Sequence, residues 1–558
     1  MRKNMWKQAG TMMLAAAIAV VTPAAGAMAD EKDVTTISLY PGDGSLSSGA
    51  VGGYLGDFFA SKGFEVEVWA YSDEKTNAIL ASGDLPDVMY VTAENLQIMI
   101  DSGMVLQLDD YLDQMPHVQA DSEILESAFN YIRKYRSNET GNVYCMPTSV
   151  GKAATGGLTD RNCVKLNWSV YEEIGAPEIT SLDDLIPLMQ QMMEARPADA
   201  DGNPYYGTVL NNGSDAKYWN GMTLWYRWHA YQEGQLAYLL EEDMVNGTYT
   251  SILEENSLYY QGLKWYNKAY QTGVLDPDSI SNDRATQKPK VDQGYTMVPS
   301  GTLPGWHDKY YEYYVPGTSV YYTSENKYGA TNNYLVVNAN TDKLDACLAF
   351  LDMLADPDAQ IYGSMGPEGD YWYTTEDGHL YLTDKAKEHL EKKDGSKYIY
   401  DNGEEAYLWN TAWILNTGEN TTYLGYDEQP VSARHTDWAE EMQYTNDTDN
   451  FNSWRETTGY DSWYDWLETE NAWCKESSLT GVDQFCSTPD DLMQLTVDAI
   501  RETVVTASWK MVYAETDEEF DSLWNAMVSD CEGLGAQDII DWRLEDIENA
   551  KAIRDALE

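Results

Sequence analysis

The sequence predicts an α/β protein with two lobes, and three observations support this fold class. The chain has 558 residues, which is more than a single hydrophobic core ordinarily organises. From residue 35 onward, segments with strand patterns alternate with segments that have helix patterns. A second series of strands and amphipathic helices follows a turn-like stretch near residue 150. Alternation of this kind is typical of parallel sheets covered by helices.

The first lobe is predicted from five segments in the order strand, helix, strand, helix, strand. In chain order they are TTISLY, residues 51–61, FEVEVWAY, DEKTNAILAS and VMYV. Gly83 and Pro86 form a turn before the last strand, and Thr92 after it is a predicted helix N-cap. Open α/β sheets bind ligands where a buried strand stops at polar residues that begin a helix. We therefore expect a ligand site at this point.

The rest of the chain contains amphipathic helices and short strands. Ser181 with Asp184, and Thr516 with Glu519, have the spacing of capping boxes at two helix starts. Strands are expected in NPYYGTVL, GYTMV and NNYLVV, and helices in LYYQGLKWYNKAYQTG and KLDACLAFLDMLAD. Residues 375–490 have weak periodicity, so we expect an irregular insertion there.

The N-terminus predicts export. Residues 1–29 have a basic start, a short apolar stretch and an Ala-Met-Ala cleavage site before Asp30, which together are typical of a signal peptide. No Cys lies near this point, so we see no lipid-attachment site and expect the extracellular face of the membrane or a periplasm. The six cysteines are scattered, and Cys474 with Cys486 form either a disulfide or two free thiols.

The charge balance excludes one class of function. Lys and Arg number 36 against 92 Asp and Glu, a formal net charge of −56 at pH 7. Such a surface repels nucleic-acid phosphates, so we expect no nucleic-acid binding. It also favours a neutral or weakly cationic ligand over a strongly anionic one.

No catalytic, metal-binding or nucleotide-binding motif stands out. The six His residues have no paired spacing, and the chain has no P-loop and no Gly-x-Ser-x-Gly elbow. The stretch from Asp199 to Asn203 resembles the start of a calcium loop but lacks the later acids of such loops. We predict no catalytic residue, metal or cofactor. The many acids leave a carboxylate pair for glycoside hydrolysis open as an alternative.

Aromatic usage favours a half-polar ligand. The chain has 42 Tyr and 19 Trp but only 8 Phe. Tyr and Trp combine an apolar face with a polar tip, which suits sugars, because a sugar ring has a C–H face and a hydroxyl rim. A general bias against Phe in the sequence is the alternative explanation.

Several stretches, taken in order, resemble one family. They are SGDLPDVMYV, DSGMVLQLDDYLDQ, GYTMVPSGTLPGW, NNYLVVNANTDKLDACLAFLDMLADPDAQIYGSMGPEGDYW and FDSLWNAMV. Their order and spacing are similar to those of the extracellular solute-binding proteins of ABC importers, family 1, which includes maltose-binding protein. The later stretches resemble the larger oligosaccharide-binding members. The resemblance covers most of residues 30–375 and again 515–535.

The resemblance implies a type II periplasmic-binding-protein-like fold, with a ligand cleft between two α/β lobes that close by hinge motion. It assigns residues 30–147 and about 318–360 to the first lobe, and 148–317 and about 361–558 to the second. Crossings between the lobes are expected near 147–152 and 316–334, with a third near 355–362.

The implied function is that of the exported substrate-binding component of an ABC importer, not an enzyme. Such a protein captures a carbohydrate, here an oligosaccharide, and delivers it to the transmembrane permease subunits. We expect it to act as a monomer. A secreted carbohydrate-active enzyme, or a binding protein for a peptide or another small polar solute, stays open as an alternative.

The resemblance also implies which residues bind the ligand. Tyr40 and Asp43 follow the first strand, where the family has its first ligand loop. Thr92 and Glu94 would present polar groups to sugar hydroxyls; alternatively, they only start a helix. Trp306, in LPGWHD, matches the position of a stacking aromatic residue.

Three further tryptophans are candidates. Trp225 and Trp228, in LWYRWHAY, form an aromatic cluster whose alternative role is in a hydrophobic core. Trp372, in GPEGDYW, belongs to a segment typical of the larger members, where turn packing is the alternative role.

Overall fold

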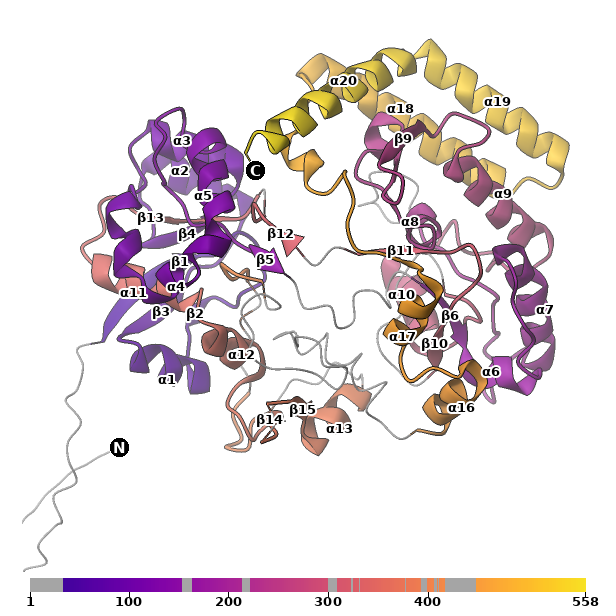
Figure 1. Cartoon of the computed structure of the whole chain (residues 1–558), viewed down its shortest axis with the longest axis horizontal. Coiled ribbons are helices and arrows are strands. Elements are labelled where there is room, and N and C mark those ends of the chain that lie inside the picture. The colour runs from indigo at the N-terminus through magenta and orange to yellow at the C-terminus, as the bar shows by residue number, and fades with distance from the viewer. Residues whose placement is uncertain are drawn as a thin grey trace, which may run out of the picture.

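Two bodies lie side by side in the computed structural model (Figure 1). The structure describes residues 34–152, 163–212, 221–299, 309–322, 325–330, 332–376, 378–392, 399–405, 409, 411–416 and 448–557. Each body has its own hydrophobic core, one built largely from residues before 152 and from 334–415, the other from residues 163–320 and 451–550. We call them the first and the second lobe.

The first lobe is an α/β unit around a five-stranded sheet of order β13-β4-β1-β3-β2. β1 is parallel to β3 and β4, whereas β13 and β2 are antiparallel to their neighbours. The elements are β1 (Thr35–Tyr40), β2 (Gly49–Ala50), α1 (Gly53–Ser61), β3 (Phe64–Val68), α2 (Asp73–Ser82), β4 (Val88–Val91), α3 (Ala93–Asp101), η1 (Asp109–Gln114), α4 (Pro116–Ala120), α5 (Ser122–Tyr135), β5 (Gly151–Lys152), β12 (Glu325–Asn326), β13 (Tyr334–Val337), α11 (Leu344–Met353), α12 (Pro357–Met365), β14 (Trp372–Thr374), β15 (Leu380–Leu382) and α13 (Asp384–Lys392).

The sequence signals for this sheet act as expected. The alternation in β3 buries every second side chain, while all four residues of the apolar β4 are buried in the middle of the sheet. Ser72 and Thr92 cap α2 and α3 through their side-chain oxygens, and Gly83 ends α2 in the left-handed conformation at φ 71°. These local signals place the strand ends that carry the site.

The first lobe extends further along the chain than we predicted. Tyr362, Trp409 and residues 412–415 belong to its core or pack against it, although the resemblance assigned residues after about 361 to the second lobe. The Tyr362 ring stacks on Phe58 at 4.6 Å, and Trp409 meets Phe59 edge-on at 5.5 Å. The weak periodicity of this segment hid its membership, because its anchors are a few isolated aromatic rings.

The second lobe joins small sheets to long helices. β6 pairs with β10, β11 pairs with β16, and β7, β8 and β9 form a meander. The elements are β6 (Val164–Asn167), α6 (Trp168–Glu173), η3 (Leu182–Asp184), α7 (Leu185–Ala195), α8 (Met222–Arg227), β7 (Tyr231–Gln232), η4 (Leu236–Tyr238), β8 (Leu240–Asp243), β9 (Thr248–Ser251), α9 (Leu258–Gln271), α10 (Arg284–Asp292), β10 (Tyr310–Tyr313), β11 (Val320–Tyr321), α16 (Asp449–Thr458), α17 (Trp463–Glu470), β16 (Trp473–Cys474), η5 (Val482–Phe485), α18 (Asp491–Val512), α19 (Asp517–Gly533) and α20 (Ala536–Asp555).

Some expectations for the second lobe differ from the structure. The predicted strands around 203–210 and 294–298 are extended segments joined by single bridges, including Tyr206 to Thr296. The region 375–490 is more regular than expected, because α13, α16 and α17 lie within it. The capping box at Ser181 is present. Thr516 caps α19 by accepting from the Glu519 N–H, but the Glu519 carboxylate accepts from the Glu515 N–H and so the second box is not reciprocal. None of the six cysteines, all of which lie in the described part of the chain, forms a disulfide, so Cys474 and Cys486 are not paired.

Three stretches of chain link the lobes, and their first-lobe ends lie together. β12 pairs antiparallel with β5, with Glu325 opposite Lys152. Beside them, the Val150 N–H donates to the Ile414 carbonyl at 2.9 Å, and the Asn416 N–H donates to the Val150 carbonyl at 2.7 Å. β5 and β12 lie on the side of the first lobe that faces the second (Figure 1). The described chain is in the first lobe up to residue 416 and in the second from residue 448, so the third crossing falls between these residues and not near 355–362.

The lobes also touch beside these links. Phe485 of η5 lies edge-on against Tyr131 and Tyr135 of α5, at ring-centre distances of 5.4 and 5.7 Å. The Tyr131 hydroxyl donates to the Gln484 carbonyl at 3.3 Å. Tyr328, between β12 and β13, completes this aromatic contact at 5.0 Å from Phe485.

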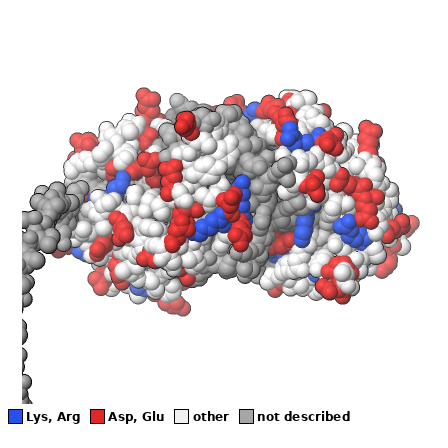
Figure 2. Space-filling model, turned by 90° about the horizontal axis from the view of Figure 1, so that it is seen from below, with Lys and Arg blue, Asp and Glu red and all other residues white. Residues whose placement is uncertain are grey.

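Acidic side chains cover the surface, and a few are buried. Figure 2 shows Asp and Glu distributed over both lobes, with Lys and Arg in small groups among them. In β8, however, Glu241 and Glu242 are buried. Burial raises the pKa of each carboxyl to about 7, and the charge of Asp483 adds to the effect at Glu242.

We predict that replacing Trp409 with Ala lowers the free energy of unfolding by about 3–5 kcal/mol, as for other buried Trp residues. Trp409 is 3% exposed and packs on the first core. Tyr373→Ala, in β14 of the same segment but 42% exposed, is the control and should change it little. Denaturant unfolding measures both; a loss below about 1 kcal/mol for Trp409→Ala would contradict the extended first lobe.

We predict that stability falls as pH rises from about 4.5 to about 7. The native state holds the Glu241 and Glu242 protons up to about pH 7, whereas unfolded carboxyls release them near 4.5. Glu242→Gln should reduce the difference in unfolding free energy between pH 5 and pH 8 by more than about 1 kcal/mol. Glu67→Gln, exposed on β3, is the control. An unchanged pH profile for Glu242→Gln would refute the assignment.

Candidate functional site

A pocket of about 210 Å³ opens at the carboxyl ends of β1 and β4. From β1 the chain passes through α1 to β3 on one side of β1, and then through α2 to β4 on the other side. The strand order therefore reverses between β1 and β4. In open α/β sheets, such a switch point leaves a crevice that binds ligands.

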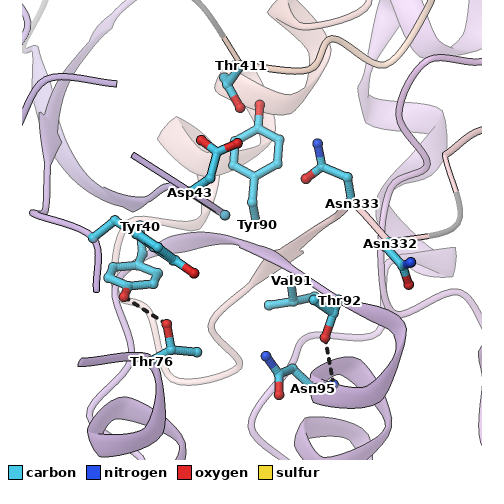
Figure 3. Close-up of a pocket in the computed structure, with 12 residues that line it drawn as sticks. Tyr40, Asp43, Thr76, Tyr90, Val91, Thr92, Asn95, Asn332, Asn333 and Thr411 are labelled. Carbon is cyan, nitrogen blue, oxygen red and sulfur yellow. Dashed lines mark hydrogen bonds between the residues drawn. The ribbon is translucent and has the colours of Figure 1, made fainter. Parts of the chain in front are cut away.

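Several segments of the first lobe line the pocket (Figure 3). The ends of β1 and β4, the segments that follow β1, β3 and β4, and the starts of α2 and α3 contribute most of the lining. Residues just before β13 and residue 411 complete it. The lining residues are Tyr40, Gly42, Asp43, Tyr71, Thr76, Tyr90, Val91, Thr92, Asn95, Asn332, Asn333 and Thr411. Asn332 and Thr411 lie near the first-lobe ends of two links, so the pocket borders the junction between the lobes.

Two tyrosines form fixed walls of the pocket. Tyr40 and Tyr90 are each 1% exposed. The Tyr40 hydroxyl donates to the Ser72 carbonyl at 2.9 Å, and the Tyr90 hydroxyl donates to the Ala412 carbonyl at 2.7 Å. Burial raises the pKa of Tyr90. Because both hydroxyls are occupied, these residues shape the pocket.

Tyr71 is the exposed aromatic ring of the pocket. Its side chain lies in the loop between β3 and α2 and is 36% exposed. The Tyr71 ring leans on Tyr40 at 5.8 Å, and its hydroxyl donates to the Asp73 carboxylate at 2.8 Å. That hydrogen bond raises the pKa of Tyr71. Held at both ends, the ring has a defined position for contact with a ligand.

Polar groups line the rest of the pocket. Asp43 accepts from the Ser45 N–H at 2.8 Å, which fixes its turn, and Thr92 accepts from the Asn95 N–H at 3.2 Å as the cap of α3. The Asn333 side chain makes no hydrogen bond within the described chain, while its carbonyl accepts from Thr148 at 2.6 Å. The described lining contains one carboxylate and neither Lys nor Arg.

Gly42 keeps this pocket open. A side-chain carbon at this position would lie 3.3 Å from the Tyr90 Cβ atom and 3.6 Å from the Asn333 Oδ1 atom. Glycine therefore lets the loop after β1 approach β4 and the Asn333 amide without filling the space between them.

The predicted site residues separate into groups. Tyr40, Asp43 and Thr92 come together in the pocket. Glu94, two residues after Thr92, is exposed and lines a different groove on the other side of the first turn of α3. Trp306 lies outside the described residues.

Three predicted tryptophans lie in cores. Trp225 and Trp228 are 5% and 0% exposed, and their indole N–H groups donate to the Leu258 and Cys163 carbonyls. Trp372 is 6% exposed and donates to the Gly366 carbonyl at 2.8 Å. The structure supports the alternative role, packing, for all three, because each ring is enclosed and each N–H already has an acceptor.

Sequence reasoning missed the other pocket residues, which are Gly42, Tyr71, Thr76, Tyr90, Val91, Asn95, Asn332, Asn333 and Thr411. The pair of Asn residues directly before the strand YLVV, and the Tyr just after the second strand, were signals that the strand-end rule could have used. Thr411 had no such signal, because its place depends on contacts between distant segments.

Within the described residues, no group of three His, Cys, Asp or Glu side chains is placed to hold a metal. In the calcium-like stretch, Asp199 instead accepts from the Asn203 amide and the Tyr295 hydroxyl, each at 2.8 Å. These bonds lower the pKa of Asp199 to about 2 and satisfy its carboxylate without a cation.

Two α/β lobes with a pocket at the switch point beside the linking strands define a solute-binding protein. The chain belongs to the bacterial extracellular solute-binding protein family, whose profile matches residues 54–361. This is a family of binding proteins rather than enzymes. No match was found among curated protein sequences. No helix in the described part of the chain is long and apolar enough to cross a membrane.

Solved structures of low sequence identity share the fold. An HMO-binding, ABC-transporter-associated solute-binding protein from Bifidobacterium longum infantis is 15% identical, with a TM-score of 0.58 over 93% of this chain and 98% of that chain. An extracellular solute-binding protein from Bifidobacterium longum subsp. infantis is 17% identical, with a TM-score of 0.59 over 95% of this chain and 99% of that chain. The substrate-binding protein FusA of an S. pneumoniae ABC transporter, in complex with kestose, is 14% identical. Its TM-score is 0.56 over 93% of this chain and 100% of that chain.

Proposed function

We propose that this protein is the exported substrate-binding component of an ABC importer and that its ligand is an oligosaccharide. The single observation that carries the proposal is the pocket at the switch point, which combines one exposed aromatic ring with an arc of hydroxyl, amide and carboxylate groups. Family membership and fold likeness to an HMO-binding protein and to a kestose complex support the same class.

The pocket chemistry matches one sugar residue. The face of Tyr71 suits the C–H face of a pyranose, and Asp43, Asn333 and neighbouring groups suit its hydroxyl rim. A volume of about 210 Å³ is smaller than the roughly 300–1,000 Å³ of sites for drug-sized ligands, so further residues of an oligosaccharide would extend beyond the pocket.

The lobe arrangement supports capture by closure. The pocket belongs to the first lobe and borders the links, so a ligand held there can be covered by the second lobe through a small rotation at the junction. The closed, monomeric protein would then present its ligand to the permease subunits. We propose that residues 1–29 act as a signal peptide that directs export of the protein.

The described pocket does not favour glycoside hydrolysis. Hydrolysis of this type uses two carboxyl groups on either side of the bond that is cleaved. The described lining offers Asp43 as its one carboxylate, and the other groups are amides, hydroxyls and aromatic rings. These groups are suited to binding.

We predict that a melting-temperature screen of oligosaccharides finds ligands that stabilise the protein, by about 2.7 kcal/mol at 100 times Kd. Tyr71→Ala should weaken calorimetric affinity about tenfold, since an aromatic contact contributes on the order of 1 kcal/mol. Asp43→Asn should weaken it by tenfold or more, because charge-assisted hydrogen bonds contribute about 1.5–3 kcal/mol. Tyr373→Ala, outside the pocket, is the control.

The screen, combined with a long incubation, distinguishes a binding protein from an enzyme. Stabilisation without turnover during long incubation supports the proposal. Steady product formation at enzyme-like rates, or unchanged affinity in both pocket variants, would refute it.

Trp306 stays a predicted stacking residue on the ground of its place in the loop sequence LPGWHD. We predict that Trp306→Ala weakens saccharide binding roughly ten- to a hundredfold with little loss of stability. The matched variant Trp225→Ala should instead lower the free energy of unfolding by about 3–5 kcal/mol, since its ring is buried in the second lobe. A sharp drop in melting temperature with unchanged affinity for Trp306→Ala would reject the stacking role.

A further inference from the structure

A second hollow adjoins the pocket. A groove of about 650 Å³ is lined by Ala93, Glu94, Gln97, Lys134, Tyr135, Arg136, Asn138 and Glu139. The first turn of α3 separates the two sites: Thr92 and Asn95 line the pocket, whereas Glu94 and Gln97 line the groove.

The groove lies where the lobes meet. Tyr135 lines it and also contacts Phe485 of the second lobe at 5.7 Å. Arg136 donates to the hydroxyl of Tyr131, which in turn donates to the Gln484 carbonyl. The groove therefore borders the interlobe contact, as the pocket borders the links.

Arg136 forms no ion pair within the described part of the chain. Among the arginines whose side chains the structure describes, it alone has no carboxylate oxygen within 4.0 Å, although the chain contains 92 acids. Its guanidinium donates only to neutral oxygens: the Tyr131 hydroxyl at 2.5 Å, the Tyr135 carbonyl at 2.9 Å and the Tyr334 hydroxyl at 3.1 Å.

These bonds leave donors for a ligand. A guanidinium has about five N–H groups, of which three are used here, so two remain. The rings of Tyr131 and Tyr334 hold the guanidinium by cation–π contact, at 4.9 and 6.0 Å. A fixed guanidinium with free N–H groups is suited to bind a carboxylate in a fork geometry.

A second cation and a pinned turn complete the groove. Lys134 also lines it and has no carboxylate partner within the described chain. Asn138 and Glu139 are consecutive non-glycine residues in the left-handed region, at φ 54° and 64°. Asn138 is tied to α3, because its amide oxygen accepts from Gln97 at 2.8 Å and its nitrogen donates to Asp101. These hydrogen bonds tie the turn to α3 and hold it in a conformation that is costly for non-glycine residues.

We propose that the groove binds the carboxylate of an acidic sugar residue, through Arg136 and assisted by Lys134, while a neutral residue of the same saccharide occupies the pocket. The inference rests on the proposed function. Glu94 and Glu139 are exposed residues of the groove lining, where they can accept hydrogen bonds from sugar hydroxyls and disfavour polyanions. One carboxylate in an otherwise neutral chain is therefore the matching ligand.

Calorimetry with matched saccharide pairs tests this proposal. The probes are cellobiose, lactose and maltotriose, each with a counterpart whose terminal CH2OH is oxidised to a carboxylate. In at least one pair, we expect the full chain from residue 30 to bind the acidic member tenfold tighter, or about 1.4 kcal/mol. Arg136→Gln should abolish that difference and leave the neutral member within threefold.

Two further variants keep the test decisive if Arg136→Gln folds poorly. Arg136→Lys retains the charge but not the fork, so it should keep only part of the preference. Lys134→Gln, at an exposed position, should reduce the preference a few-fold without changing the melting temperature.

The possible results of these measurements distinguish the carboxylate assignment from the proposed function. Equal affinity within every pair, or equal loss of acidic and neutral binding in Arg136→Gln, would overturn the carboxylate assignment and make Arg136 a structural cation. If neutral saccharides bind and acidic ones do not, the carboxylate assignment is wrong but the proposed saccharide-binding function stands. If no saccharide binds, the proposed function fails with it.

Discussion

The junction around Val150 is the constraint on which the rest of the structure depends. Here the first-lobe ends of three links lie hydrogen-bonded side by side: β5 pairs with β12, and the Val150 backbone bonds Ile414 and Asn416. The Asn416 amide also donates to the Ser149 and Gly151 carbonyls, each at 2.9 Å. Because all three links leave from one small area, the lobes can rotate about it while each keeps its own core.

Both candidate binding hollows lie around this junction, and that placement ties binding to lobe movement. The pocket is built at the ends of β1 and β4, and its far wall is formed by residues close to the links. The groove beyond α3 reaches the contact between Tyr135 and Phe485. A saccharide lying across both would touch the first lobe along its length, and closure would bring the second lobe over it. The acidic surface keeps such a protein soluble and leaves recognition to local groups.

Local patterns in the sequence predict much of the first lobe and part of the site. TTISLY and VMYV coincide with β1 and β4, and Thr92 caps α3 as expected. The rule that ligands bind at strand ends points to Thr92, whereas Tyr40 and Asp43 are expected from the family resemblance. The sequence could not decide whether Trp225 and Trp228 bind a ligand or pack in a core, because aromatic residues at helical spacing give the same pattern in both cases. The third link and Thr411 depend on contacts between distant segments, which no local pattern encodes.

Small-angle X-ray scattering of the chain from residue 30, with and without a saturating saccharide, tests the hinge account most directly. If the lobes close about the junction at Val150, the radius of gyration decreases when the ligand saturates the protein, and the interlobe distance distribution shifts to shorter values. An unchanged radius of gyration under conditions where calorimetry shows full occupancy would contradict the account.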